Sequence, residues 1–337
     1  MSIKIQKWTN FFAKPIDKFK NWVYNSGTSK NKRVIKPKRK KEKTMKKIIS
    51  LLLALAMMCS AMFALASCGG KDTCKIGVQQ GTTGELYLKG DADMAFAGYS
   101  NIECKSYNTA GLAVQAMIDG QINYVIIDNE VAKALADQNP ETKVINVALS
   151  AEEYAFGVDK AQDDIKTALN ELLAEMKADG SLDAIFAKYD SLEYDADGNV
   201  IGGDDAIVGI DSAAKNNDNA AGQLVVATNA AFAPFEYKKG NQFAGIDMEI
   251  MKALADKMGL ELVIEDMDFD AVVTSVGKNN IDIAASGLTI KESRKQAVNF
   301  SDSYFSEAFQ VLIVPTSNTE FDSCKTKADI EAILKAK

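Results

Sequence analysis

The feature that most constrains the fold is an alternation of short apolar runs with amphipathic helical stretches, which continues from Cys68 onward. Such alternation is typical of α/β folds with mostly parallel sheets, because each helix carries the chain back between parallel strands. Apolar residues at helical spacing predict helices at 161–176 and 245–258, the second ended by Gly259. The expected strands are 75–79, 124–127, 144–147, 224–227, 262–265 and 281–284.

Composition narrows the class of function. The chain has 337 residues, of which 47% are hydrophobic, enough to bury a core in two lobes or domains. Residues 1–67 hold 16 Lys and Arg against two acids, whereas the remainder has 23 basic and 44 acidic residues, a net charge of −21. This strongly acidic remainder argues against nucleic-acid binding, because nucleic-acid binding needs a basic surface. The absence of histidine removes the commonest general base and most transition-metal sites, although carboxylates, Lys or Tyr could still catalyse a reaction.

A basic start, an apolar run and small residues before a cysteine follow one another at 45–68. Two lysines follow Met45, the apolar run covers 48–65, and the segment ends Leu-Ala-Ser-Cys at Cys68. This order predicts a secretory signal, and its last four residues resemble the lipobox of bacterial lipoproteins. The resemblance implies lipidation of Cys68 and an extracytoplasmic protein anchored to the cell membrane. The alternative is an uncleaved anchor, because the run is nearly long enough to span a bilayer.

Residues 1–44 are basic and begin with an aromatic-containing stretch. They could form an amphipathic segment at a membrane surface or in the cytoplasm. The alternative, which we favour, is that translation starts at Met45 and that this extension is no part of the mature protein, because Met45 already begins a complete signal.

Residues 191–222 interrupt the alternation of strands and helices. They are rich in turn formers and acids, which predicts a linker with one small hairpin around Asp197 and Gly198. The spacing of Asp195, Asp197 and Asn199 weakly resembles that of a calcium-binding loop, but Val200 occupies the position where such a loop needs glycine. We therefore expect no metal and no cofactor.

Several motifs in the exported part occur together in one protein family. Residues 224–315 contain TNAAFAPFEY (228–237), FAGIDMEI (243–250), MDF (267–269), ASGLTIKESR (285–294) and VNFSDSYF (298–305). Residues 75–189 contain IGVQQGTT (76–83), AVQAMIDGQINYVIID (113–128) and KADGSLDAI (177–185). The first group resembles the first lobe of family 3 bacterial solute-binding proteins, which serve ABC importers of polar amino acids. The second group resembles the family's second lobe and its carboxyl-terminal helices.

The order of these segments departs from the family, whose chain runs from the first lobe to the second and back. Here second-lobe material comes first, so the chain resembles a circular permutant. The resemblance implies a periplasmic-binding-protein-like type II fold, two α/β lobes joined by crossover strands near 149–153 and 310–314. Permutation is tolerated where the ends lie at the surface, and about 30 flexible residues can span on the order of 30 Å. The rival is a recombined gene fragment that folds poorly or swaps segments with a second copy.

The expected domains follow from this reading of the motifs. They are the basic extension 1–44, the signal 45–67, the main part of the second lobe 68–150, the first lobe's terminal helices 151–190, the linker 191–222, the main part of the first lobe 223–312, and the hinge with the second lobe's first helix 313–337.

A free amino acid offers a carboxylate, an ammonium and a side chain, and burying either charge unpaired is costly. The planar fork of Arg294 suits the carboxylate, and Thr82 and Thr83, at a strand-to-helix turn, can add donors. Asp128 ends a β-type run and can accept the ammonium at the carboxyl edge of a sheet. The resemblance implies further ligand-binding roles for Ser286, Gly287 and Thr289 in the cradle, and for Asn229, Phe232 and Phe269 around the side chain.

Two residue types bear on finer questions. Family members that bind cationic side chains often carry an acid where this chain has Asn229, so the resemblance implies a neutral polar ligand. Among the remaining cysteines, a disulfide between Cys104 and Cys324 would be compatible with an oxidising compartment.

The expected function is capture of a polar amino acid by lobe closure and its delivery to an ABC importer permease, by a monomer without catalytic activity. One alternative is an enzyme on the same fold, of dehydratase or cell-wall lyase type, which would need a spare acid such as Asp128, Glu85 or Glu236. Another is a sensory or non-functional permuted binding module.

Overall fold

The computed structural model describes residues 73–190, 192–194, 200–203, 206–216 and 222–337. The extension 1–44, the signal 45–67 and Cys68 lie outside the described residues, as does the weak calcium-loop echo at 195–199. In the part of the chain that is described, no helix combines the length and the apolar character needed to cross a bilayer. The segment Asp72–Lys337 forms one compact unit.

One five-stranded sheet contains four strands from the first half of this unit and one from its last part. Its order is β2-β1-β3-β17-β4, built from Cys74–Gln79 (β1), Ile102–Tyr107 (β2), Tyr124–Asp128 (β3), Thr142–Ile145 (β4) and Gln310–Pro315 (β17). β1 is parallel to both β2 and β3, whereas β17 is antiparallel to β3 and β4. This sheet and its helices are here called the second lobe: Thr83–Lys89 (α2), Ala110–Ile118 (α3), Asn129–Gln138 (α4) and Lys327–Lys335 (α10).

A second five-stranded sheet repeats the same topology. Its order is β13-β9-β14-β6-β15, from Gly157–Val158 (β6), Gln223–Thr228 (β9), Glu261–Asp266 (β13), Ile283–Ala284 (β14) and Asn299–Phe300 (β15). β6 is the antiparallel strand, inserted between β14 and β15. This sheet defines the first lobe. The first lobe also contains a small sheet of Ala231–Phe232 (β10), Glu236–Lys239 (β11) and Gln242–Ala244 (β12). Its helices are Asp163–Asp179 (α5), Ser181–Asp190 (α6), Ile246–Met258 (α7), Phe269–Ser275 (α8) and Glu292–Lys295 (α9).

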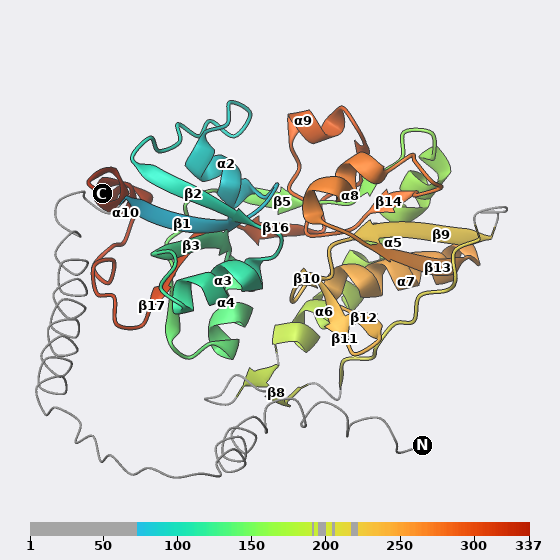
Figure 1. Ribbon diagram of the computed structural model, residues 1–337. Coiled ribbons are helices and arrows are strands. Elements are labelled where there is room, and N and C mark those ends of the chain that lie inside the picture. The colour runs from blue at the N-terminus through green and yellow to red at the C-terminus, as the bar shows by residue number, and fades with distance from the viewer. Residues whose placement is uncertain (1–72, 191, 195–199, 204–205, 217–221) are drawn as a thin grey trace, which may run out of the picture. The chain divides into compact units, whose positions relative to one another are not determined.

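The antiparallel strand of each large sheet, β6 or β17, is reached by chain that comes from the other lobe. The chain therefore crosses between the lobes twice. The crossings are Glu152–Tyr154 (β5) and Phe305–Ala308 (β16), which pair with each other between the two large sheets (Figure 1). The expectation of a crossover at 310–314 is therefore wrong. That run is almost entirely apolar and is buried as β17 between β3 and β4, whereas the half-exposed residues just before it make the crossing.

The predicted helices and strands are confirmed, with shifted ends. α5 and α7 bury their apolar faces, and each ends at a glycine in the left-handed region, Gly180 (φ 80°) and Gly259 (φ 67°). All five residues of β3 are buried, as expected for a central strand. Strand β4 begins two residues before its predicted start, and β14 is shorter than predicted.

The linker is partly structured. Strands Glu193–Tyr194 (β7) and Val200–Gly202 (β8) pair antiparallel and flank the predicted turn, which itself lies outside the described residues. Further on, Ile207 and Ile210 are buried, and Ile210 forms a bridge with Phe243. The stretch 206–216 is therefore not a free tether, because Ile207 and Ile210 join the core of the first lobe.

The expected disulfide is wrong: Cys74, Cys104 and Cys324 are all free thiols in the described chain. Cys104 and Cys324 pack against the apolar cluster of the second lobe. Burial raises the pKa of Cys104, which keeps it in the thiol form. These residues behave as small hydrophobic side chains.

Candidate functional site

Polar side chains from both lobes meet where the sheets face each other. Asp128 ends β3, and Thr82 and Thr83 follow β1, so all three lie at the carboxyl edge of the second-lobe sheet. Residues 285–289 follow β14 in the first lobe, and Arg294 comes from α9. The predicted site residues therefore converge on the junction between the two lobes, here called the cleft.

Arg294 reaches across this cleft. Its Nη1 donates to the carbonyl of Thr289 at 2.9 Å, and its Nη2 donates to the carbonyl of Gly81 in the second lobe at 3.2 Å. Its Cζ lies 5.4 Å from the centroid of the Phe269 ring. Loss of solvent around the guanidinium lowers the pKa of Arg294, whereas the charges of Glu152 and Asp128 oppose that shift. No ion pair joins Arg294 to a carboxylate of the described residues.

Asp128 is buried on the opposite side of the cleft. Its Oδ1 accepts a hydrogen bond from the Tyr154 hydroxyl. Burial raises the pKa of Asp128 to about 7, and the nearby charge of Glu152 adds to the shift. A carboxyl group in this state gains strongly from a cation, because an ammonium group would stabilise its ionised form.

The two predicted threonines differ in their contacts. The Thr82 hydroxyl donates to the carbonyl of Gln79 at 2.7 Å, so it is used within its own turn. The Thr83 hydroxyl lies 3.3 Å from the Thr289 hydroxyl, across the cleft. Thr83 and Thr289 therefore face the same space from the two lobes.

Glu152, on crossover strand β5, was missed by the sequence reasoning. Its Oε1 accepts from the Ser150 hydroxyl at 2.6 Å and from Gln310 Nε2 at 3.1 Å, and its Oε2 accepts from the Thr289 hydroxyl at 2.7 Å. The side chain is buried. The only local signal was an acid in alternation with Tyr154 on a strand, which does not reveal that both faces of the strand are covered.

Two buried acids hold the loop at Ser286 and Gly287. The Ser286 hydroxyl donates to Glu236 Oε1 at 2.7 Å, and the Gly287 amide donates to Asp247 Oδ2 at 3.0 Å. Burial raises the pKa of Asp247 to about 7, and burial together with the charge of Asp247 raises the pKa of Glu236 well above its usual range. Gly287 has φ 50°, and a Cβ there would lie 3.0 Å from Phe232 Cε1, so a side chain does not fit.

Both polar atoms of the Asn229 side chain form hydrogen bonds within the protein. Its Nδ2 donates to the carbonyl of Met267 at 2.7 Å, and its Oδ1 accepts from Gln79 Nε2 at 2.9 Å across the cleft. The Asn229 amide N–H also donates to the Ser286 hydroxyl. Phe232 and Phe269 are both buried beside these residues. Gln79 is a second residue that sequence reasoning missed.

Several buried side-chain oxygens around this cleft have no hydrogen-bond partner. Among the described side chains, the buried oxygens without a partner are Gln79 Oε1, Thr228 Oγ1, Glu236 Oε2 and Gln310 Oε1. Buried polar atoms are rarely left unpaired. Such atoms fit a cleft that receives hydrogen-bond donors from a bound molecule.

The cleft is closed at its mouth by further contacts between the lobes. Lys291 Nζ lies 2.7 Å from Asp91 Oδ2, and their side chains are only 9% and 17% exposed. The Ser293 amide donates to Asp93 Oδ2 at 2.9 Å, beside this pair. The structure thus represents a closed arrangement of the two lobes.

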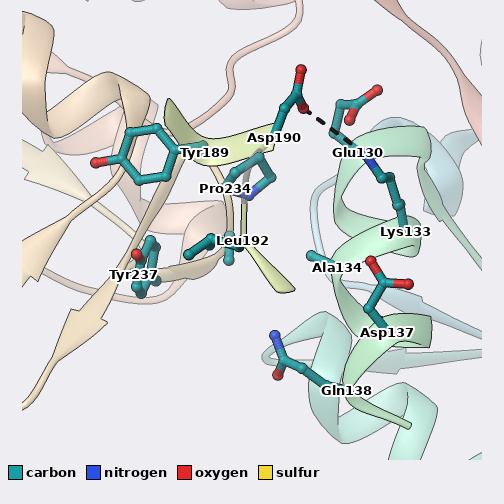
Figure 2. Close-up of a pocket in the computed structure, with 11 residues that line it drawn as sticks. Glu130, Lys133, Ala134, Asp137, Gln138, Tyr189, Asp190, Leu192, Pro234 and Tyr237 are labelled. Atoms are coloured by element: carbon teal, nitrogen blue, oxygen red, sulfur yellow. Dashed lines mark ion pairs between the residues drawn. The ribbon is translucent and has the colours of Figure 1, made fainter. Parts of the chain in front are cut away.

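A separate crevice lies away from the predicted site. Figure 2 shows it between α4, with Lys133, Asp137 and Gln138, and the segments that carry Tyr189, Pro234 and Tyr237. Its volume is about 130 Å³, and none of the predicted site residues lines it. The Lys133–Asp190 pair across it is 3.9 Å long and well exposed, so it contributes little to stability.

The two-lobed α/β fold, with a polar cleft between lobes that are joined by two crossover strands, is of the periplasmic-binding-protein type II class. Residues 224–336 match the model of the bacterial extracellular solute-binding proteins, family 3. This match agrees with the family resemblance read from the motifs of that segment.

Individual relatives and solved structures match over limited parts of the chain. The arginine-binding extracellular protein ArtP of Bacillus subtilis (strain 168) is 37% identical over 32% of this chain and 42% of its own length. A probable histidine-binding protein of Neisseria gonorrhoeae is 40% identical over 27% of this chain and 34% of its own length. The arginine-bound domain 1 of TmArgBP is 33% identical, over 37% of this chain and all of that chain, with a TM-score of 0.25. The chain thus spans less than half the length of the two curated relatives.

Proposed function

We propose that the protein is an extracytoplasmic solute-binding protein that captures a polar amino acid between its lobes and delivers it to the permease of an ABC importer. The observation that carries this proposal is the cross-cleft pair of charged groups. Arg294 donates only to backbone carbonyls and has no carboxylate partner among the described residues, and the charges of the buried Glu152 and Asp128 act on its guanidinium. An α-amino acid supplies the two complementary charges.

The roles follow from this geometry. Arg294 pairs with the ligand carboxylate through its two-donor fork, and Asp128 accepts the ammonium. Thr83 and Thr289 line the same space from opposite lobes. Ser286 and Gly287, held by Glu236 and Asp247, complete the cradle. The aromatic rings of Phe232 and Phe269 hold the side chain, with Asn229 and Thr82 shaping the walls through their own contacts.

Closure about β5 and β16 is the proposed conformational step. The contacts of Arg294 with Gly81, of Thr83 with Thr289 and of Lys291 with Asp91 join the lobes only when the cleft is shut. A ligand that bridges Arg294 and Asp128 favours this state, since it adds interactions that the open state lacks. The permease recognises the closed form.

The matched relatives carry the names of amino-acid-binding proteins, which favours binding over catalysis or sensing. One of those names includes the word extracellular, in line with export. Anchoring through a lipid on Cys68 and a monomeric state rest on the sequence and are part of the proposal.

The permuted order of the lobes, with the domain boundaries given above, is also part of the proposal. Helix α10, which leads into the strand equivalent to β1 in the family order, packs here beside β1: Leu334 and Ile330 share an apolar cluster with Cys74 and Ile76. This neighbourhood supports a connection that was cut between α10 and β1.

A thermal-shift screen against the twenty amino acids tests the function. A ligand at 100 times its Kd stabilises the folded state by about 2.7 kcal/mol, so a selective rise in Tm is expected. A cooperative melt that no amino acid shifts would contradict the proposed function. Loss of any cooperative melt would favour the broken-fragment alternative.

A further inference from the structure

Tyr154, on crossover strand β5, is a fully buried residue that lies between the lobes. The centroid of its ring lies 5.0 Å from that of Phe235 in the first lobe and 5.6 Å from that of Phe305 on the second crossover strand. The Tyr304 amide donates to the Tyr154 carbonyl at 3.0 Å, and Tyr154 forms an antiparallel bridge with Thr289. First-lobe and crossover residues therefore fix both the backbone and the ring of this tyrosine.

The hydroxyl of Tyr154 reaches the second lobe. It donates a hydrogen bond to Oδ1 of Asp128, the residue that ends β3 and is itself only 4% exposed. Burial raises the pKa of Tyr154 well above its ordinary value, and the charge of Asp128 adds to the shift. The hydroxyl therefore keeps its proton and acts as the donor. Because a hydrogen bond to an ionised acceptor is stronger than one to a neutral acceptor, this contact favours the ionised form of Asp128.

Other charged and polar groups act on Asp128 or feel its charge. They are Glu152 on β5, Gln310 on β17, Glu236 on β11 and Arg294 on α9. Burial and the charge of Glu152 raise the pKa of Asp128, whereas the contacts with Tyr154 and Gln310 lower it. The Gln310 amide nitrogen also donates to Glu152, at 3.1 Å. The single hydroxyl hydrogen of Tyr154 is given to Asp128, so Tyr154 is the donor that serves this carboxyl group.

Resting on the function proposed above, we propose that Tyr154 is the positioning residue of the ammonium site. Its hydroxyl, held in place from the first lobe, orients the Asp128 carboxyl and favours the ionised form that pairs with the ligand ammonium. Rotation of the Asp128 side chain would break this bond and leave a buried hydroxyl unpaired, which is costly. Tyr154 acts on the ligand through Asp128, so the ammonium site of the second lobe depends on packing in the first.

Titration of Asp128 in the ligand-free protein is the first test. The full chain, in mild detergent, is labelled with ¹³C at the aspartate carboxyl carbons, and the signal that disappears in Asp128→Asn identifies Asp128. Tyr154→Phe keeps the ring and removes only the hydroxyl. The pKa of Asp128 should therefore rise further above its value of about 7, by about one unit or more. An equal or lower pKa of Asp128 in Tyr154→Phe would overturn the inference.

Calorimetry with arginine as the probe tests the effect on binding. The quantity compared is the ratio of the Kd of Tyr154→Phe to the Kd of the wild type, from about pH 6 to pH 9, and titration of the ligand cancels in this ratio. With the pKa of Asp128 raised by about one unit, the ratio should fall by about fivefold or more across this range, because Asp128 is ionised in both proteins at the upper end. A ratio that does not change with pH, as a purely structural role would give, would overturn the inference.

Tyr189→Phe is the matched control. Tyr189 is also buried, and its hydroxyl donates to Glu249 Oε1 at 2.7 Å, away from the residues assigned to the ligand. The ratio of its Kd to that of the wild type should stay near one at every pH, and a pH-dependent ratio here would count against a particular role for Tyr154. Failure to bind any amino acid would overturn the proposed function, whereas binding with an unshifted titration of Asp128 would overturn only the role of Tyr154.

Discussion

Replacing Arg294 by alanine removes the group that we assign to the ligand carboxylate. In the closed structure the guanidinium makes two hydrogen bonds, one of them across the cleft to Gly81, and lies against Phe269. Removing one member of a desolvated charge pair costs about 2–5 kcal/mol. Because Arg294 is only partly buried, we expect about 3 kcal/mol, or roughly a 150-fold rise in Kd.

Calorimetry at fixed salt measures this loss. The Kd of Arg294→Lys should lie between the Kd of the wild type and that of Arg294→Ala, because lysine keeps the positive charge but lacks the planar two-donor guanidinium. Lys295→Ala is the control, since Lys295 is exposed and pairs with Glu292 on the same helix. A Kd for Arg294→Ala equal to that of the wild type would refute the assignment of the carboxylate.

Three further predictions follow from other contacts. Burial raises the pKa of Asp128 to about 7, so this carboxyl becomes protonated below that pH. Ligand affinity should therefore fall as the pH decreases through 7. The variant Asp128→Asn should bind the ligand weakly, and its affinity should not show that pH dependence. Lys291→Met removes the ion pair with Asp91 that joins the two lobes, and stopped-flow kinetics should show faster ligand release, by on the order of tenfold. Lys252→Met, in an exposed pair on α7, should release ligand at the wild-type rate. Leu169→Ala in the fully buried face of α5 should lower the free energy of unfolding by about 2–5 kcal/mol in denaturant melts, and a loss near zero would mean that this face is not packed as described.

Much of the fold was predictable because local sequence carries it. The apolar run before Asp128 gives β3, and the helical spacing of apolar residues gives α5 and α7. The position of β17 was not predictable, because an apolar run does not state which strands it will separate. The two-residue strand β6 is too short to leave any periodic signal.

The site divides in the same way. Asp128 was identifiable because it follows an apolar run, and Gln79 occupies the corresponding place at the end of β1; that rule, applied to every strand, would have found Gln79. Glu152 is different. Its importance arises from contacts with Thr289 and Gln310, which are 137 and 158 residues away in the chain. Such long-range proximity depends on the two crossovers and is not encoded in local spacing.

In the proposed complex an amino acid lies between the lobes, held by Arg294 and Asp128. A crystal structure of the protein grown with arginine tests it most directly. The ligand carboxylate is expected within hydrogen-bond distance of the Arg294 guanidinium, about 2.7–2.9 Å, and the ligand ammonium beside Asp128. Arginine bound elsewhere, for example in the crevice between α4 and Pro234, or bound in the cleft without contact to either residue, would contradict the account.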